Sequence, residues 1–257
     1  MNCTTCDAKL PEGKKMCTEC GAFNVTSPTV NGENDGTILL ENVVSAEHDK
    51  INIKEWNYCW GGGLVRKSTT LLGGMPGAGK STMLLQMCEL FVKEIPTRET
   101  LYIAAEEDLD AIKMRADRLG IQGMGRMRML PAIGGVANVS SILHTRKPGA
   151  VILDSLQGLF GDDAKDCEDA LDVLKKFSSL LDSPVIIVSQ VTKEGDYAGQ
   201  MAFQHHVDTL MFLTPEEGEE GEEADRILSV RKNRNGPAFI ESVFEMTERG
   251  LMIVDDE

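Results

Sequence analysis

The sequence predicts an α/β protein with a mostly parallel central sheet, helices on both faces of that sheet, and antiparallel strands toward the carboxyl end. From Ile38 onward, short strand-like apolar runs alternate with longer helix-like segments. This alternation is typical of a parallel sheet covered by helices. After about residue 190, apolar runs follow one another through loops without helices between them. That change of pattern predicts an added antiparallel meander.

The first expected strand, residues 68–74, enters a glycine-rich loop, and a helix over 81–94 follows it. The runs AVILD and PVIIVSQ consist almost wholly of apolar residues, as expected for strands buried on both faces. Gly120 is expected to end its helix. The remaining helices are expected over 109–120, 139–147 and 164–182, and the strands over 100–106, 126–132, 150–154, 184–190, 207–214, 226–232, 239–247 and 250–256.

Composition sets limits on the class of protein. The chain has 257 residues, 42% of them hydrophobic and 26% charged, which suits one full core with a small appendage. It has neither an apolar leader at its amino end nor a run of 18 apolar residues, so we expect a cytoplasmic protein without a membrane partner. A formal net charge of −15 argues against bulk attraction to DNA. A local basic channel, especially one shared between subunits, remains compatible with that charge.

Four of the seven cysteines lie near the amino end in two CxxC pairs. This spacing is typical of a tetrahedral zinc ribbon, and a segment this short needs the metal to fold. We therefore expect a zinc ribbon over residues 1–24, a linker over 25–37 and one large domain over 38–257. The isolated Cys59, Cys88 and Cys167 are interpreted as packing residues. The expected Zn²⁺ ligands are Cys3, Cys6, Cys17 and Cys20.

The sequence GMPGAGKS fits the phosphate-loop pattern G-x-x-x-x-G-K-[ST] and lies between an expected strand and an expected helix, the context that the motif requires. Backbone N–H groups of such a loop surround phosphate oxygens. Lys80 is expected to reach the β- and γ-phosphates, and the Ser81 hydroxyl to bind Mg²⁺. The chain is therefore expected to bind a nucleoside triphosphate through Gly74, Met75, Pro76, Gly77, Ala78, Gly79, Lys80, Ser81 and Thr82.

Polar residues at the ends of three other strands complete the expected site. Asp154 ends an apolar strand and is expected to hold Mg²⁺ through water. Glu106 and Glu107 follow the strand TLYIAA, where one carboxylate can orient and deprotonate the attacking water. We assign that role to Glu106 and a supporting role to Glu107. Gln190 ends a further strand and is a candidate sensor of the γ-phosphate.

These motifs together resemble the bacterial RadA/Sms proteins, which are RecA-superfamily ATPases of DNA recombination and repair. The resemblance covers essentially the whole chain, including the cysteine-rich amino end. It is carried by WGGGLVRKSTTLLGGMPGAGKST, LYIAAEED, AIKMRADRLG, VILDSLQ, VTKEGDYAGQMAFQHHVD and KNRNG.

The resemblance implies a RecA-like P-loop ATPase core that forms a hexameric ring with ATP sites between protomers. It implies single-stranded DNA as a partner, branch migration of recombination intermediates as the activity, and a recombinase or other repair protein as a possible further partner. By this resemblance, Glu106 is the catalytic glutamate and Lys193 a DNA contact. Lys232 and Arg234 are implied to act on a neighbour's ATP.

The chain departs from the family pattern in several places. Asn235 stands where the family signature Lys-Asn-Arg-Phe-Gly has phenylalanine, and Ser189 and Gln190 replace a usual Gly-His. The sequence stops at Glu257, so a form without the Lon-protease-like carboxyl domain is expected. The insert PEEGEEGEEAD is interpreted as a solvated loop, or as a segment near the DNA loops that restrains non-specific binding.

Two other functions remain open from the sequence. One is a KaiC-like, ATP-driven protein switch that does not use DNA; the other is a DnaB-like replicative helicase. His205 and His206 are expected to lie on a helix and are interpreted as structural or interface residues. The cations of KNRNG have two explanations, a DNA-binding patch and a turn that acts on the next subunit's triphosphate. We favour the second explanation.

Overall fold

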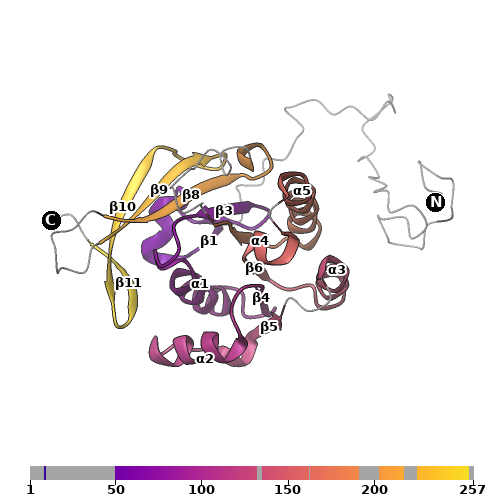
Figure 1. Cartoon of the computed structure of the whole chain (residues 1–257), viewed down its shortest axis with the longest axis horizontal. Helices are drawn as coiled ribbons and strands as arrows, with labels where there is room; N and C mark the ends of the chain where they lie inside the picture. The colour runs from indigo at the N-terminus through magenta and orange to yellow at the C-terminus, as the bar shows by residue number, and fades with distance from the viewer. Residues whose placement is uncertain are drawn as a thin grey trace, which may run out of the picture. The chain divides into compact units, whose positions relative to one another are not determined.

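The structure is a computed structural model that describes Lys9 and residues 50–131, 135–161, 163–190, 203–216 and 225–254. The chain divides into two compact units, Met1–Glu47 and His48–Glu257. The second unit carries the α/β fold (Figure 1). The predicted zinc ligands Cys3, Cys6, Cys17 and Cys20, the linker over 25–37, and Lys193 lie outside the described residues.

The described residues of this unit form one large sheet of nine strands in the order β11-β10-β9-β8-β3-β7-β6-β4-β5. The strands from β8 to β5 are parallel to one another, whereas β8, β9, β10 and β11 pair in antiparallel fashion. Their bounds are β3 Thr69–Gly73, β4 Thr100–Ala104, β5 Met127–Pro131, β6 Ala150–Asp154, β7 Val185–Val188, β8 Thr209–Pro215, β9 Arg226–Asn233, β10 Ile240–Thr247 and β11 Gly250–Ile253.

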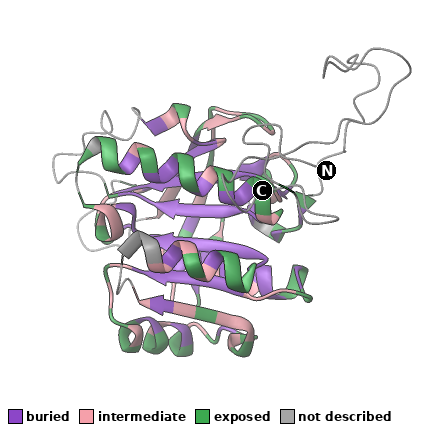
Figure 2. Cartoon of the chain, turned by 90° about the vertical axis from the view of Figure 1, so that its right-hand side faces the viewer, coloured by how far each residue is buried: buried purple, intermediate pink, exposed green. Residues whose placement is uncertain are grey.

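Helices cover both faces of the sheet, as Figure 2 shows by the layers of buried strands between half-exposed helices. The α-helices are α1 Lys80–Glu94, α2 Leu109–Arg118, α3 Gly135–Arg146, α4 Leu156–Phe160 and α5 Ala164–Leu181. Short 3₁₀ segments are η2 Lys54–Trp60, η3 Met124–Arg126 and η4 Phe203–His205, and a separate small hairpin joins β1 Lys50–Ile51 to β2 Leu64–Val65. Among the described residues, no helix has both the length and the apolar character needed to cross a membrane.

The core has two halves because successive side chains of a strand point to opposite faces of the sheet. On β6, Ile152 belongs to the half of the core that contains buried residues of α1, α2 and η2, while its neighbours Val151 and Leu153 belong to the half that contains residues of α3, α4 and α5. Both faces are apolar, so the central strands are continuous hydrophobic runs. Each fully buried leucine or isoleucine contributes about 1.5–3 kcal/mol to stability.

The predicted fold class is confirmed, including the parallel core and the antiparallel carboxyl-terminal strands. The helix predicted over 139–147 begins earlier, at Gly135, and the predicted helix around the two histidines is only the 3₁₀ turn η4. The segment η2 was not predicted. Trp56 of η2 stacks on Phe244 of β10 at 4.4 Å between ring centroids, a tertiary contact that periodicity does not reveal.

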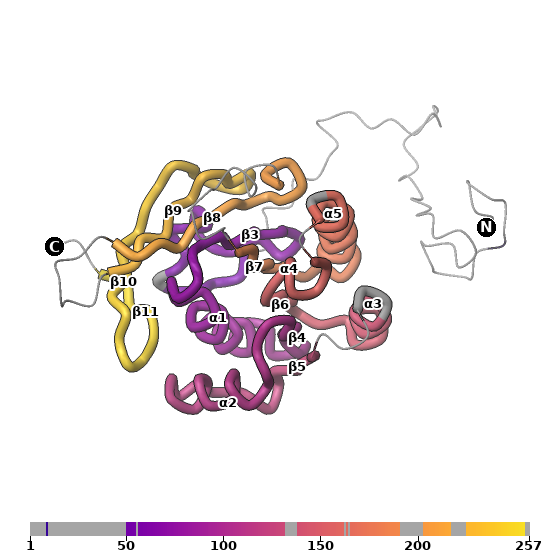
Figure 3. The backbone as a smooth tube through the Cα atoms, viewed as in Figure 1, coloured from indigo at the N-terminus to yellow at the C-terminus, as the bar shows by residue number. Residues whose placement is uncertain are grey.

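The topology positions the site. Parallel strands β3, β4, β6 and β7 all end at the same edge of the sheet, and ligands of open α/β sheets bind outside that edge. The backbone trace in Figure 3 shows the carboxyl-terminal hairpin of β10 and β11 running back alongside α1. The hairpin therefore forms a wall beside the same edge.

Candidate nucleotide-binding site

The phosphate loop connects β3 to α1, and Lys80 is the first residue of that helix. Its Nζ donates hydrogen bonds to the carbonyl oxygens of Gly74 at 2.7 Å and Met75 at 2.9 Å. The side chain is buried. Burial lowers the Lys80 pKa, although the carboxylates of Asp154 and Glu106 act in the opposite direction. The ammonium group is thus held inside the loop, where phosphate oxygens of a ligand would lie.

Two glycines of this loop are required by their surroundings. Gly79 has φ 101° and precedes α1, and a Cβ atom there would lie 2.5 Å from the Met246 methyl carbon. Gly74 has φ 151°, and a Cβ atom there would lie 2.3 Å from the Leu213 carbonyl oxygen. Because larger residues rarely adopt such positive φ angles, both positions need glycine. The backbone can then present its N–H groups to an anion at the start of α1.

Asp154, the last residue of β6, lies within hydrogen-bond distance of the helix start. Ser81 Oγ donates to Asp154 Oδ2 at 2.8 Å, and the Tyr102 hydroxyl donates to the same oxygen at 2.6 Å. Tyr102 is 1% exposed, and its pKa is raised well above the usual value by burial and by the Asp154 charge. It therefore remains a hydrogen-bond donor. A serine hydroxyl beside an oriented carboxylate fits the oxygen ligands that Mg²⁺ requires.

Glu106 and Glu107 are neighbours in sequence but have different environments. Gln190 Nε2 donates to Glu106 Oε2 at 2.6 Å, and burial raises the Glu106 pKa despite this hydrogen bond. Glu107 instead forms a two-bond ion pair with Arg115 of α2, with distances of 2.6 and 2.8 Å. The hydrogen bonds and charge of Arg115 lower the Glu107 pKa. Paired carboxylates with pKa values shifted apart suit different chemical roles.

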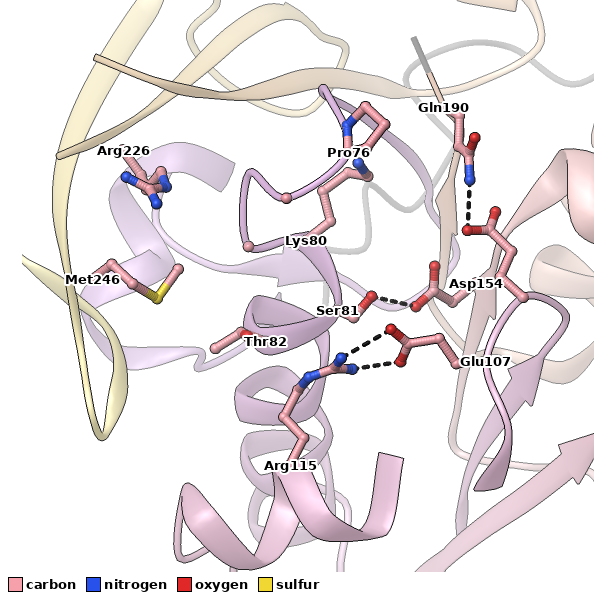
Figure 4. Close-up of a pocket in the computed structure, with 13 residues that line it drawn as sticks. Pro76, Lys80, Ser81, Thr82, Glu107, Arg115, Asp154, Gln190, Arg226 and Met246 are labelled. Carbon is pink, nitrogen blue, oxygen red and sulfur yellow. Dashed lines mark hydrogen bonds and ion pairs between the residues drawn. The ribbon is translucent and has the colours of Figure 1, made fainter. Parts of the chain in front are cut away.

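These groups line a cavity of about 420 Å³. Figure 4 shows Lys80, Ser81 and Asp154 on one side of it, with Gln190 above and Arg115 and Glu107 below. Arg226 of β9 and Met246 of β10 close the opposite side. Arg226 Nε donates to the Ala78 carbonyl oxygen at 3.2 Å. The antiparallel extension of the sheet thus contributes a wall to a pocket whose floor is the phosphate loop.

The cations of KNRNG lie at the other end of β9. Thr209, the first residue of β8, pairs with Asn233, whereas Pro215 at the pocket end pairs with Arg226. Lys232 Nζ donates to the carbonyl oxygens of Gln204 and of Val207, the latter at 2.8 Å. Burial and the nearby Arg234 charge lower the Lys232 pKa. The Arg234 side chain is 49% exposed and lies 3.3 Å from Asp208, so both cations have acceptors within the chain.

Asp208 organises that second cluster. Its Oδ2 accepts hydrogen bonds from the backbone N–H and the hydroxyl of Thr69, both at 3.0 Å. Its Oδ1 lies 3.3 Å from Lys175 Nζ and from Arg234. Burial alone would raise the Asp208 pKa, but the Thr69 hydrogen bonds and the Lys175 charge outweigh burial and lower it. The carboxylate therefore joins β3, α5 and the turn after β9.

The structure brings most of the sequence-predicted residues together. The pocket is lined by Pro76, Gly77, Gly79, Lys80, Ser81, Thr82, Glu106, Asp154 and Gln190. Lys232 and Arg234 are not part of this pocket. His206 lies 2.9 Å from Asp172 of α5, while Cys59, Cys88 and Cys167 are buried as predicted.

Four residues of the site were not predicted from the sequence: Tyr102, Arg115, Arg226 and Met246. A hydroxyl in the middle of a fully buried strand was a signal for Tyr102, because buried polar groups need a partner. Arg115 follows Glu107 by eight residues, and only the direction of α2 brings them into contact. Arg226 and Met246 reach the pocket through strand pairing that the sequence does not specify. These contacts depend on tertiary packing.

Comparisons with known proteins agree with this geometry. Residues 37–196 match the AAA domain family. The DNA repair protein RadA of Treponema pallidum is 32% identical over 99% of this chain, and RadA of Bacillus subtilis is 31% identical over 97%. The chain spans 58% of the length of each. The KaiC-like protein PH0186 of Pyrococcus horikoshii superposes with a TM-score of 0.66 at 16% identity, covering 80% of this chain and 98% of PH0186, which shows the same RecA-like fold.

Proposed function

This chain belongs to the AAA domain family, its relatives at about 30% identity are RadA proteins, and we propose that it is a RecA-like DNA repair ATPase. The observation that carries the proposal is the carboxylate pair beside the phosphate loop. Glu106 has a raised pKa and faces the pocket, while Arg115 holds Glu107 in an ion pair. Of these two glutamates, Glu106 is thereby the one available as the base.

The reaction is hydrolysis of ATP to ADP and phosphate. Lys80 and the loop N–H groups bind the β- and γ-phosphates and neutralise their charge. Glu106 accepts a proton from water as the water oxygen bonds to the γ-phosphorus and the bond to the bridging oxygen breaks. Ser81 and Asp154 would hold Mg²⁺, which would supply positive charge to offset the negative charge of the phosphates. Gln190 keeps Glu106 oriented toward the γ-phosphate.

The finer proposal is that hydrolysis drives translocation on single-stranded DNA and branch migration, with protomers assembled as a hexameric ring. The RadA relatives support this proposal through their description as DNA repair proteins.

Arg234 is half exposed and distant from its own pocket, which supports its proposed action on the triphosphate of a neighbouring protomer. Lys232, anchored to two carbonyls, would hold the turn for that contact. Lys193 is the proposed DNA contact, and the four amino-terminal cysteines remain the proposed Zn²⁺ ligands.

The test is the rate of ATP hydrolysis with and without single-stranded DNA at low salt. We expect DNA to raise turnover several-fold and Lys80→Ala to abolish it, because no other group in the loop replaces that charge. Lys93→Ala is the matched control, since Lys93 lies on the same helix, is exposed, and pairs with Glu89 in the part of the chain that the structure describes.

Turnover that does not change with single-stranded, duplex or forked DNA would contradict the DNA assignment. Such a result would favour the KaiC-like protein switch. The likeness to PH0186 shows a shared fold and is not evidence for that function. Strong preference for forked duplex, with unwinding, would favour the replicative helicase instead. Loss of ATP hydrolysis in Lys93→Ala would mean that damage to helix α1, and not loss of the Lys80 charge, explains the inactivity of Lys80→Ala.

A further inference from the structure

We propose that the amino-end edge of the parallel sheet, opposite the nucleotide pocket, binds the phosphate backbone of duplex DNA. The contacts come from a row of arginine and lysine side chains, here called the basic edge. This assignment rests on the proposed DNA repair function, but it concerns a surface outside the nucleotide pocket and a form of DNA other than the single strand. The basic edge consists of Arg66, Lys67, Arg98, Arg128, Arg146 and Lys147.

The strand register brings these cations to one edge, although they are widely separated in the sequence. Strands β5, β4, β6, β7 and β3 are neighbours in that order and begin at about the same level. The five strands span about 19 Å at the usual spacing of about 4.8 Å. One strand of a duplex presents about five or six phosphates over that length. Cations lie at or just before the start of four of these strands: Arg128 at β5, Arg98 before β4, Arg146 and Lys147 before β6, and Arg66 and Lys67 before β3.

In the described part of the chain, the basic edge has more cations than carboxylates, although the whole chain has a net charge of −15. Glu99 lies 2.8 Å from Arg128 and 3.8 Å from Arg146, so two cations share one carboxylate. Further carboxylates at this edge are Asp182, paired with Lys67, and Glu94, which follows Lys93 at the end of α1. The side chains of Arg128 and Arg146 are about half exposed and accessible to a phosphate. In an otherwise acidic protein, such an edge attracts a polyanion.

Arg98 holds the strand starts together behind this surface. Its guanidinium donates to the carbonyl oxygens of Lys147 at 3.1 Å and Leu181 at 2.7 Å, which precede β6 and β7. Burial lowers the pKa of Arg98; the Asp182 carboxylate opposes this effect, and the nearby Arg66 charge adds to it. The row is therefore fixed before DNA binds, which reduces the ordering that binding requires. Its cations are also close enough to repel one another, and a bound phosphate offsets that repulsion.

The composition of the basic edge suits a duplex better than a single strand. Proteins bind single strands through aromatic side chains that stack on the bases, together with cations. The exposed tyrosine and phenylalanine of the described residues, Tyr58 and Phe239, lie on η2 and just before β10. In the sheet order, β10 lies beyond β8 and away from the row. The row therefore offers phosphate contacts without stacking, and a duplex presents its phosphates with its bases already stacked inside.

The experiment measures binding of a short fluorescent duplex and of single-stranded DNA to the whole chain by anisotropy, over a series of salt concentrations. The main variant combines Arg128→Ala, Arg146→Ala and Lys147→Ala. We expect it to weaken duplex binding about tenfold or more at about 0.1 M salt. The slope of log K against log salt should become shallower by about 2.7, because each phosphate contact contributes about 0.9. Basal ATP turnover and single-strand binding should change less than about twofold, since their residues lie elsewhere.

Two further variants separate a local phosphate contact from net charge and from folding. The combination Lys113→Ala, Lys165→Ala and Arg249→Ala removes the same charge from exposed positions on α2, α5 and the β10–β11 turn, and it should leave duplex binding nearly unchanged. Glu99→Gln removes the carboxylate that competes for Arg128 and Arg146. We expect it to strengthen duplex binding about threefold, a gain that a misfolded protein does not produce. Melting temperatures show that each variant is folded.

Duplex binding that is unchanged in the main variant, or weakened as much by the charge-matched control, would overturn the basic edge. Unchanged or weaker binding in Glu99→Gln would also overturn it, as would equal losses for duplex and single strand in the main variant. Equally tight binding of poly(glutamate), lost in the main variant, would reassign the edge to an acidic protein segment. If the unmodified chain binds neither form of DNA, the proposed DNA repair function itself fails, which is a different result from the others.

Discussion

The two ends of strand β9 both carry cations, yet they differ in what surrounds them. At the amino end, Arg226 faces a cavity of about 420 Å³ that also holds Lys80 and Glu106. At the other end, Lys232 and Arg234 contact carbonyls and Asp208 of their own chain. The two ends are separated by about 20 Å, from the rise of a strand over six residues. The number of cations in a stretch of sequence is therefore a poor guide to a binding site. The position of each cation relative to the ends of the strands determines whether it lies at the pocket.

The carboxylates at the two ends show the same difference. At the pocket, burial raises the Glu106 pKa, so that group is prepared to exchange a proton. At the far end, hydrogen bonds and cations lower the Asp208 pKa, so that group stays charged and holds elements together. The first arrangement suits catalysis and the second suits stability.

The largest expected effect separates the two adjacent glutamates. We expect Glu106→Gln to lower the ATP turnover rate by about 10²–10⁴-fold with ATP affinity retained, because the amide cannot accept a proton. Glu107→Gln should lower the rate much less, since its carboxylate serves Arg115. Steady-state hydrolysis together with a calorimetric ATP titration checks both variants. Comparable losses of turnover in the two variants would contradict the assignment of Glu106 as the base and Glu107 as the partner of Arg115.

A smaller effect is expected at the far end of β9. Asp208→Asn should lower the free energy of unfolding by about 2 kcal/mol, because Lys175 and Arg234 lose their shared anion, while ATP affinity stays unchanged. Asp182→Asn is the control; its ion pair with Lys67 is exposed and is worth about 0–1 kcal/mol. Urea denaturation measures both.

The sign of the pH dependence follows from the lowered Asp208 pKa. The Asp208 contribution to stability should be present at neutral pH and should decline as pH falls below the ordinary value of about 3.9 and through the lowered pKa. Asp208→Asn should therefore differ from the unmodified chain at neutral pH and converge with it in strong acid. A loss of ATP affinity in Asp208→Asn would instead show that the cluster at the far end of β9 affects binding in the pocket.

Much of the site could be predicted from local sequence. Glycine spacing identified the phosphate loop, and the ends of apolar strands identified Asp154 and Glu106, because parallel strands finish at one edge. Tyr102, Arg115 and Met246 could not be predicted in this way, since their contacts depend on how β4, α2 and β10 pack. Arg226 and Lys232 lie close in sequence, but an extended strand places them at opposite ends. Two cations that are close in the sequence therefore need not belong to the same site.

The most direct test of the proposed catalytic role is the pH dependence of the turnover rate at saturating Mg²⁺ and ATP. Since Glu106 must be ionised to accept a proton and burial raises its pKa, turnover should fall on the acid side at a pH above the ordinary glutamate value of about 4.3. The Gln190 hydrogen bond lowers this pKa, so Gln190→Ala should move the acid limb to still higher pH. An acid limb at or below the ordinary value, unmoved in Gln190→Ala, would contradict the assignment of Glu106 as the base.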